Sequence, residues 1–333
     1  MSFATDRAGR ADTPPPRRSG GGVHLGIGLL IFAGLGLILE SSYIFHVLIL
    51  CFLWSIVVAG WDLVLGYAGI FNFAQLVFFA VGAYASGMLS ISMGFHPIVA
   101  LLIAAVVAGL FGLLIGLPCL RLRGEYVALF TFAVHLALPP LIIQGRALGT
   151  GGSTGLIGVP PLQAFGLTMH TVDKQAWYFL TLAAAALVLY AVYFRVLRGK
   201  LGKAFVAMRD AEDFARALGV NEYKHKLIAF ILSATITGFA GALYAHYIGV
   251  VTPKILGNEF FLMVMLMLSV GGLGRFPGAI LGAFAITIGN ELLRDTGQYR
   301  LLLLGTCVVL VILLVPEGLP QLRERGARLF GRK

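Results

Sequence analysis

The chain has little charge: Asp, Glu, Lys and Arg make up 12% of its 333 residues, whereas hydrophobic residues make up 59%. A soluble protein carries about 25% charged residues, so this chain lacks the polar surface that a water-soluble fold needs. The same hydrophobicity excludes a disordered protein. We therefore predict an all-α protein that crosses a membrane several times.

Motifs for chemistry are also scarce. The three cysteines show no CxxC spacing and no Cys/His cluster, so neither a zinc site nor a disulfide framework is indicated. Residues 149–155 are rich in glycine but lack the lysine of a Walker A phosphate loop, and no hydrolase motif occurs elsewhere. We predict that the chain is not an enzyme and binds no metal or cofactor. A transport step driven by ATP would then need a separate ATPase subunit.

Apolar runs of membrane-spanning length follow a short basic segment. Residues 1–22 contain four arginines, three consecutive prolines and three consecutive glycines, a composition typical of a disordered tail. Ten apolar runs are predicted to be transmembrane helices: 23–39, 43–60, 73–92, 97–118, 126–143, 176–194, 227–250, 260–273, 276–290 and 301–315. The runs 260–273 and 276–290 are short, so they are either two short spans or one paired excursion into the membrane.

The distribution of positive charge predicts the orientation. If all ten runs cross and the N-terminus is cytoplasmic, 20 of the 25 Lys and Arg residues lie on the cytoplasmic side, as the positive-inside rule requires. The net charge of +10 then records orientation rather than a nucleic-acid partner. The transmembrane domain covers 23–318, and 319–333 form a basic cytoplasmic tail. A weak match between 66–69 and 238–241 suggests an inverted repeat of five plus five spans.

The most polar internal loop has a helical pattern. Within the cytoplasmic segment 197–226, apolar residues recur every three or four positions and predict one amphipathic helix that ends at Gly219. These residues are Leu201, Phe205, Met208, Ala211, Ala215 and Leu218. Opposite charges four residues apart support the helix, namely Glu212 with Arg216 and Arg209 with Asp213. The helix could lie on the bilayer, connect two spans in solvent, or dock into a groove of a cytoplasmic partner.

A turn between two predicted spans lies in an unusually apolar stretch. Between 60 and 84 the sequence is apolar apart from Asp62, Asn72 and Gln75. A turn that does not enter water predicts a helix broken inside the protein, near 61–75, with freed backbone groups facing a cavity. Asp62 then either faces a transport pathway or pairs structurally. Asn72 and Gln75 could equally hydrogen-bond between helices.

Between 43 and 320 a series of short motifs resembles the integral-membrane permeases of branched-chain amino acid ABC importers, in particular the LivM-like branch. Their order and spacing carry the resemblance, because each motif alone is weak. The motifs lie at 65–69, 81–84, 122–129, 151–156, 208–210, 217–220, 226–234, 238–245, 271–274 and 316–319.

The resemblance implies a function. A permease of this family imports a small solute across the bacterial inner membrane by alternating access. It pairs with a second, related permease subunit, two cytoplasmic ATPases that bind Mg·ATP, and a periplasmic binding protein. The broken helix and the resemblance together suggest a substrate pathway at Asp62, Gly66, Gly69, Asn72 and Gln75. The resemblance also implies that the polar loop couples to the ATPases through Phe205, Met208, Arg209, Asp210, Glu212, Leu218 and Gly219.

Three departures from the family pattern leave the substrate open. Asp62 stands where the family commonly has Asn, residues 72–75 replace Ser-Leu-Gly-His or Ser-Leu-Gly-Gln, and Arg275 replaces a small or polar residue. Related importers carry urea, short amides or aromatic acids, so the substrate is a branched-chain amino acid or a similarly small polar solute. The alternative function is a self-sufficient secondary transporter or channel that couples to protons through Asp62 and needs no coupling helix.

Overall fold

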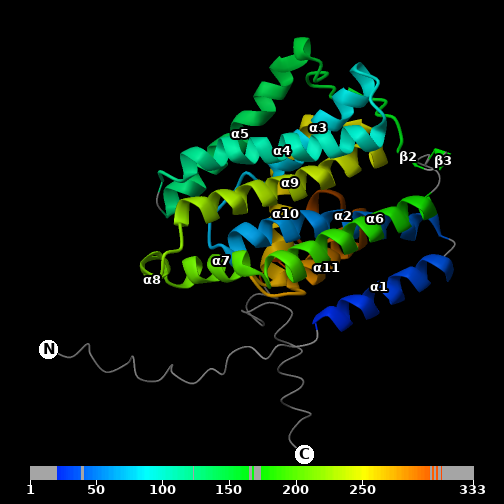
Figure 1. Cartoon of the computed structure of the whole chain (residues 1–333). Coiled ribbons are helices and arrows are strands. Elements are labelled where there is room, and N and C mark those ends of the chain that lie inside the picture. Colours follow the sequence, from blue (N-terminus) through cyan, green and yellow to red (C-terminus); the bar gives the residue numbers. More distant parts are fainter. Residues whose placement is uncertain are drawn as a thin grey trace, which may run out of the picture.

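The computed structural model describes residues 21–38, 41–122, 124–164, 167–168 and 174–300, together with 302, 303, 305, 306 and 309. These residues form a bundle of helices (Figure 1). The first helix, α1 (Gly21–Ile38), begins inside the segment that we predicted as a tail. The predicted C-terminal tail 319–333 and most of the tenth apolar run lie outside the described residues.

Six helical segments in the described part of the chain are long and apolar enough to cross a membrane. They are α2 with a π-helical turn η1 (Ser42–Asp62 and Leu63–Tyr67), α3 (Gln75–Ser92), α4 (Pro97–Cys119), α5 with a 3-10 turn η2 (Glu125–Gln144 and Gly145–Leu148), α6 with a π-helical end η3 (Lys174–Leu189 and Tyr190–Val196), and α9 (Glu222–Ile248). A helix bonds its backbone groups internally, which a lipid environment demands. The chain is therefore a multi-pass membrane protein.

Two shorter apolar helices, α10 (Asn258–Gly271) and α11 (Gly278–Leu292), lie at the predicted runs 260–273 and 276–290. Their 14 and 15 residues give lengths of about 21 and 23 Å, less than the hydrocarbon thickness of about 30 Å. They pack closely, because a Cβ atom added at Gly271 would collide with the Gly278 backbone. The predicted break between the two runs is confirmed, whereas the total of ten spans stays a prediction.

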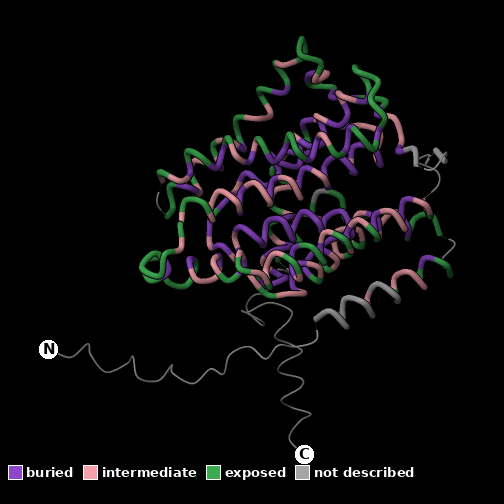
Figure 2. The backbone as a smooth tube through the Cα atoms, viewed as in Figure 1, coloured by how far each residue is buried: buried purple, intermediate pink, exposed green. Residues whose placement is uncertain are grey.

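Helix α9 lies at the centre of the bundle and packs against α3 and α4 (Figure 1). The contact with α3 depends on glycine: a Cβ atom at Gly82 would collide with the carbonyl oxygen of Gly238, and one at Gly241 with that of Phe79. Small residues let membrane helices approach this closely. Buried positions accordingly follow α2, α3 and α9 through the interior, whereas half of α5 and most of α8 are exposed (Figure 2).

The two segments that suggested an inverted repeat have different structures. Residues 66–69 lie in and after the π-helical turn that ends α2, whereas 238–241 lie in the middle of α9. This pair therefore does not support the repeat.

Short elements cover the two ends of the bundle. At one end β1 (Leu156–Ile157) pairs with β4 (Val250–Val251) and β2 (Gln163–Ala164) pairs with β3 (Leu167–Thr168), both antiparallel. The 3-10 turns η4 (Pro253–Leu256) and η5 (Arg294–Tyr299) follow in the chain. After α6, the short helices α7 (Lys200–Asp210) and α8 (Glu212–Ala217) lead into the start of α9.

Candidate functional site

The helix break lies at the end of α2, where the sequence predicts it. The π-helical turn η1 is followed by residues 68–74, which form no helix although most of them are buried. Their backbone is bonded inside the protein. The Ile70 amide donates to the Val64 carbonyl oxygen at 2.9 Å, and the Phe73 amide donates to Thr131 Oγ1 of α5 at 3.0 Å. Trp61 Nε1 donates to the Asn72 carbonyl oxygen at 2.7 Å. These bonds allow an irregular backbone within a membrane bundle.

Asp62 is fully buried and holds two other segments. Its Oδ1 accepts the Gly274 amide at 2.7 Å, and its Oδ2 accepts the Tyr193 hydroxyl at 3.1 Å. Gly66 packs directly on this carboxylate, because an added Cβ atom would collide with Asp62 Oδ1 and with the Gly274 amide nitrogen. Asp62 therefore joins α2 to the turn between α10 and α11 and to η3.

Gln75 bonds to α9, and Asn72 bonds to Gln75. The Gln75 side chain donates to Thr237 Oγ1 and accepts the Ser233 hydroxyl at 3.1 Å. Asn72 Oδ1 accepts the Ala74 amide at 2.9 Å, which fixes the turn before α3. Both side chains are fully buried. The bonds of Gln75 match the interhelical role that the sequence left open, whereas the Asn72 side chain bonds locally to Ala74 and Gln75.

Arg209 connects α7 to the helix break. Its Nη1 donates to the Gly66 carbonyl oxygen at 2.7 Å, and its Nε donates to Asp210 Oδ1 at 2.9 Å. Gly69, with φ of +69°, lies against the arginine side chain: an added Cβ atom would stand 2.7 Å from Arg209 Cγ. The same addition at Gly274 would stand 2.8 Å from Arg209 Nη1. The structure thus brings Arg209, a predicted coupling residue, into contact with Gly66 and Gly69, two predicted pathway residues. The sequence did not predict this contact.

The prediction of one continuous amphipathic helix over 201–218 is wrong. The helix is interrupted at Ala211, with φ of −156° and ψ of 79°, and so forms two helices, α7 and α8. Phe205, Met208 and Ala215 are buried as predicted. The break changes the direction of the chain, and Ala211 and Leu218 are exposed instead. Gly219 has φ of +86°, as the predicted helix terminator requires.

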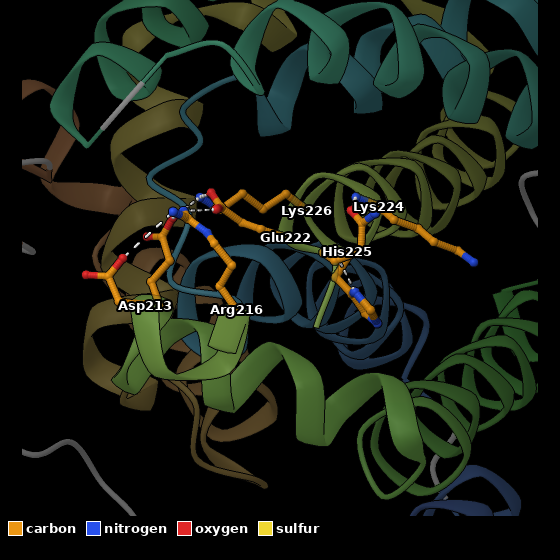
Figure 3. Close-up of polar contacts among 8 residues, drawn as sticks. Asp213, Arg216, Glu222, Lys224, His225 and Lys226 are labelled. Carbon is orange, nitrogen blue, oxygen red and sulfur yellow. Dashed lines mark hydrogen bonds and ion pairs between the residues drawn. The ribbon is translucent and has the colours of Figure 1, made fainter. Parts of the chain in front are cut away.

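A cluster of ion pairs ties α8 to the start of α9 (Figure 3). Arg216 lies 2.5 Å from Glu222 and 3.7 Å from Glu212, and Lys226 lies 3.1 Å from Glu212 and 2.5 Å from Glu222. The hydrogen bond that Arg216 donates to Glu222 raises the pKa of Arg216. The predicted pair of Glu212 with Arg216 is present. Arg209 pairs with Asp210 rather than with Asp213, because the break at Ala211 separates them.

Large apolar side chains stand exposed beside this cluster. The exposed fractions are 66% for Phe214, 70% for Leu218 and 61% for Tyr223. A contiguous exposed apolar patch with a polar rim marks an interaction site, so these three side chains are a candidate contact surface. We call Phe214, Leu218 and Tyr223 the apolar tip.

A cavity of about 160 Å³ separates the helix break from the ends of α4, α5, α7 and α9. Its walls include Gly69, Phe71, Arg209, Glu212 and Lys226. Of the predicted pathway residues, Gly69 lines this inner cavity, whereas Asp62, Gly66, Asn72 and Gln75 lie behind its wall. The helix break is also bonded to Tyr193, Gly274 and Thr131. The sequence did not predict these three residues, because nothing in their local pattern marks a contact across the bundle.

Known proteins resemble this chain along most of its length. Residues 43–315 match the family described as branched-chain amino acid transport system, permease component. The chain is 31% identical to the high-affinity branched-chain amino acid transport system permease protein LivM of Escherichia coli K12, over 92% of this chain and 77% of that protein. No solved structure shows a significant match.

Two more distant relatives have the same kind of function in their names. A probable branched-chain amino acid transport permease protein LivM of Methanocaldococcus jannaschii is 27% identical, over 80% of this chain and 90% of that protein. The permease protein LivH of Escherichia coli K12 is 24% identical over the same shares. These matches confirm the resemblance drawn from the motifs. The chain belongs to the permease family of branched-chain amino acid transport systems.

Proposed function

We propose that this chain is a permease subunit of an ATP-driven ABC importer that moves branched-chain amino acids inward across the bacterial inner membrane. It works beside a second, related permease subunit, with Mg·ATP bound to two cytoplasmic ATPases and substrate delivered by a periplasmic binding protein. Both termini and the α7–α8 segment face the cytoplasm. Family membership supports the transport role, and the excess of cytoplasmic Lys and Arg supports the orientation.

The observation that carries the proposal is the contact of Arg209 with the helix break. The apolar tip offers an ATPase a surface at α8, and the buried side chains of Phe205 and Met208 anchor α7 in the bundle. When the ATPases close on ATP, they displace α8 and α7. Arg209 then moves the Gly66 carbonyl group and the chain around Gly69, which lines the inner cavity. Such a two-state element is what alternating access requires.

The bonds of Asp62 argue against the proton-coupled alternative. A proton-carrying carboxylate must meet water on each side of the membrane in turn. Asp62 is fully buried, both of its oxygens accept hydrogen bonds, and it does not line the inner cavity. These contacts support a structural role.

Uptake of radiolabelled leucine into proteoliposomes tests the proposal. We expect uptake only when both permease subunits, the ATPases, the binding protein and internal ATP are present. Uptake that persists without the ATPases and follows a proton gradient would establish the alternative instead.

A further inference from the structure

A second cavity lies at the other end of the bundle. It has a volume of about 260 Å³, just below the roughly 300–1,000 Å³ that small-molecule pockets occupy. Helices α2, α9, α10 and α11 form its walls. It lies near the start of α2, whereas Arg209 lies at the other end of that helix. The cavity's deepest α2 residue, Trp54, precedes Gly66, the residue that Arg209 contacts, by 12 positions, about 18 Å of helix.

The walls of this outer cavity divide into an apolar part and a polar part. Trp54, Phe260 and Met263 contribute apolar surface, and Trp54 is held in place by stacking on Phe79 at 5.5 Å between ring centroids. The polar part includes Glu259, Glu291 and Arg300, so both signs of charge meet at one opening. An apolar surface beside paired opposite charges complements a small zwitterion that carries a hydrocarbon side chain.

The polar groups have capacity for a ligand. Arg300 and Glu259 approach only to 4.0 Å, a loose contact that leaves the guanidinium able to bind a carboxylate. Glu291 accepts Tyr43 at 2.7 Å and Arg294 at 3.0 Å, both on Oε1, so Oε2 can accept a further donor. The hydroxyl group of Thr287 is buried in the wall, where the Cys51 thiol is its neighbour.

We propose that this outer cavity binds a free α-amino acid with an apolar side chain, as the first site that the substrate occupies in the permease. The inference rests on the proposed function and adds its location and chemistry. Arg300 binds the carboxylate, Glu259 and Glu291 bind the ammonium group, and the side chain lies against Phe260 and Met263. The two cavities share no wall residue, as expected of an importer that opens one side at a time.

Saturation-transfer NMR on the complete transporter in nanodiscs, without the binding protein, tests the site. The probe is L-leucine, and the matched probes 4-methylpentanoate and isopentylamine each lack one charged group. We expect saturation of the leucine methyl groups, with about a tenfold weaker signal from either matched probe. Arg300→Gln removes the carboxylate partner, and Met263→Trp fills the cavity. Each should weaken the leucine signal about tenfold, whereas Lys254→Gln, an exposed cation outside the cavity, should not.

The outcomes separate this site from the proposed function. ATPase activity stimulated by the binding protein confirms that each variant is assembled. Equal leucine signals from the wild type, Arg300→Gln and Met263→Trp would overturn the site, and so would the absence of any signal from the wild type. Either result leaves the proposed function standing as long as the proteoliposomes import leucine. If no branched-chain amino acid is imported by the wild type, the proposed function itself fails.

Discussion

The helix break at 62–75 and the α7–α8 segment touch through Arg209, yet they use their polar and apolar groups in opposite ways. In the break, Asp62, Asn72 and Gln75 are fully buried and hydrogen-bonded. In α7–α8 the charges form exposed pairs, and Phe214 and Leu218 face outward. Buried hydrogen bonds fix the geometry of the break, whereas α8 exposes side chains that can contact another molecule.

The largest effect should come from crowding the break. In Gly66→Val the new side chain collides with the Asp62 carboxylate and the Gly274 backbone, neither of which is free to move. Overpacking costs about 1–3 kcal/mol or more, so folded protein and transport should both be lost. Size-exclusion yield and thermal unfolding measure this. Gly289→Ala is the control, because nothing lies within 4 Å of its added Cβ atom; equal yields from the two variants would show that the break is loosely packed.

Charging the apolar tip should separate assembly from stability. The double variant Phe214→Asp, Leu218→Asp should keep the unfolding temperature of the wild type, because both side chains are already exposed. The amount of ATPase that co-purifies with this variant should fall about tenfold or more, since an interface anchor contributes about 2 kcal/mol or more. Leu148→Asp, 78% exposed but on η2 and remote from α8, is the control. Normal co-purification of the double variant would remove the apolar tip from the ATPase interface.

Replacement of Asp62 tests whether its carboxylate has a structural role or lines the substrate pathway. In Asp62→Asn the amide oxygen can still accept the Gly274 amide, and its NH₂ group can donate to the Tyr193 oxygen. The lost charge should cost about 1–2 kcal/mol of stability, whereas the leucine uptake rate should stay within about twofold of the wild type. Asp210→Asn, at an exposed position, is the control. Loss of uptake at unchanged stability would place Asp62 in the pathway.

The smallest effect should follow loss of an exposed ion pair. Arg216→Gln removes the links from α8 to Glu222 and Glu212, and such exposed pairs contribute about 0.2–1 kcal/mol each. We expect the unfolding temperature to fall by about 1–3 °C at low salt, and the difference from Lys224→Gln to shrink in 1 M salt. A difference that salt does not reduce would mean that Arg216 acts through packing.

The sequence predicts most helices because lipid leaves few alternatives to a long apolar helix. It also predicts the break, since the stretch from 60 to 84 is too apolar for a turn in water. It does not predict that Ala211 divides the coupling segment, because the spacing of apolar residues fits a continuous helix and only packing against the bundle decides otherwise. The partners of Asp62 come from residues 193 and 274, and no local pattern marks such distant contacts.

The number of imported leucine molecules per ATP hydrolysed, measured in proteoliposomes, tests the link through Arg209 most directly. Arg209→Gln removes the charged donor to the Gly66 carbonyl group, a bond of about 1.5–3 kcal/mol. We predict that import then falls about tenfold or more while ATP hydrolysis stays within about twofold. Lys203→Gln, an exposed cation on the same helix, should leave the ratio unchanged. A wild-type ratio in Arg209→Gln would contradict the account.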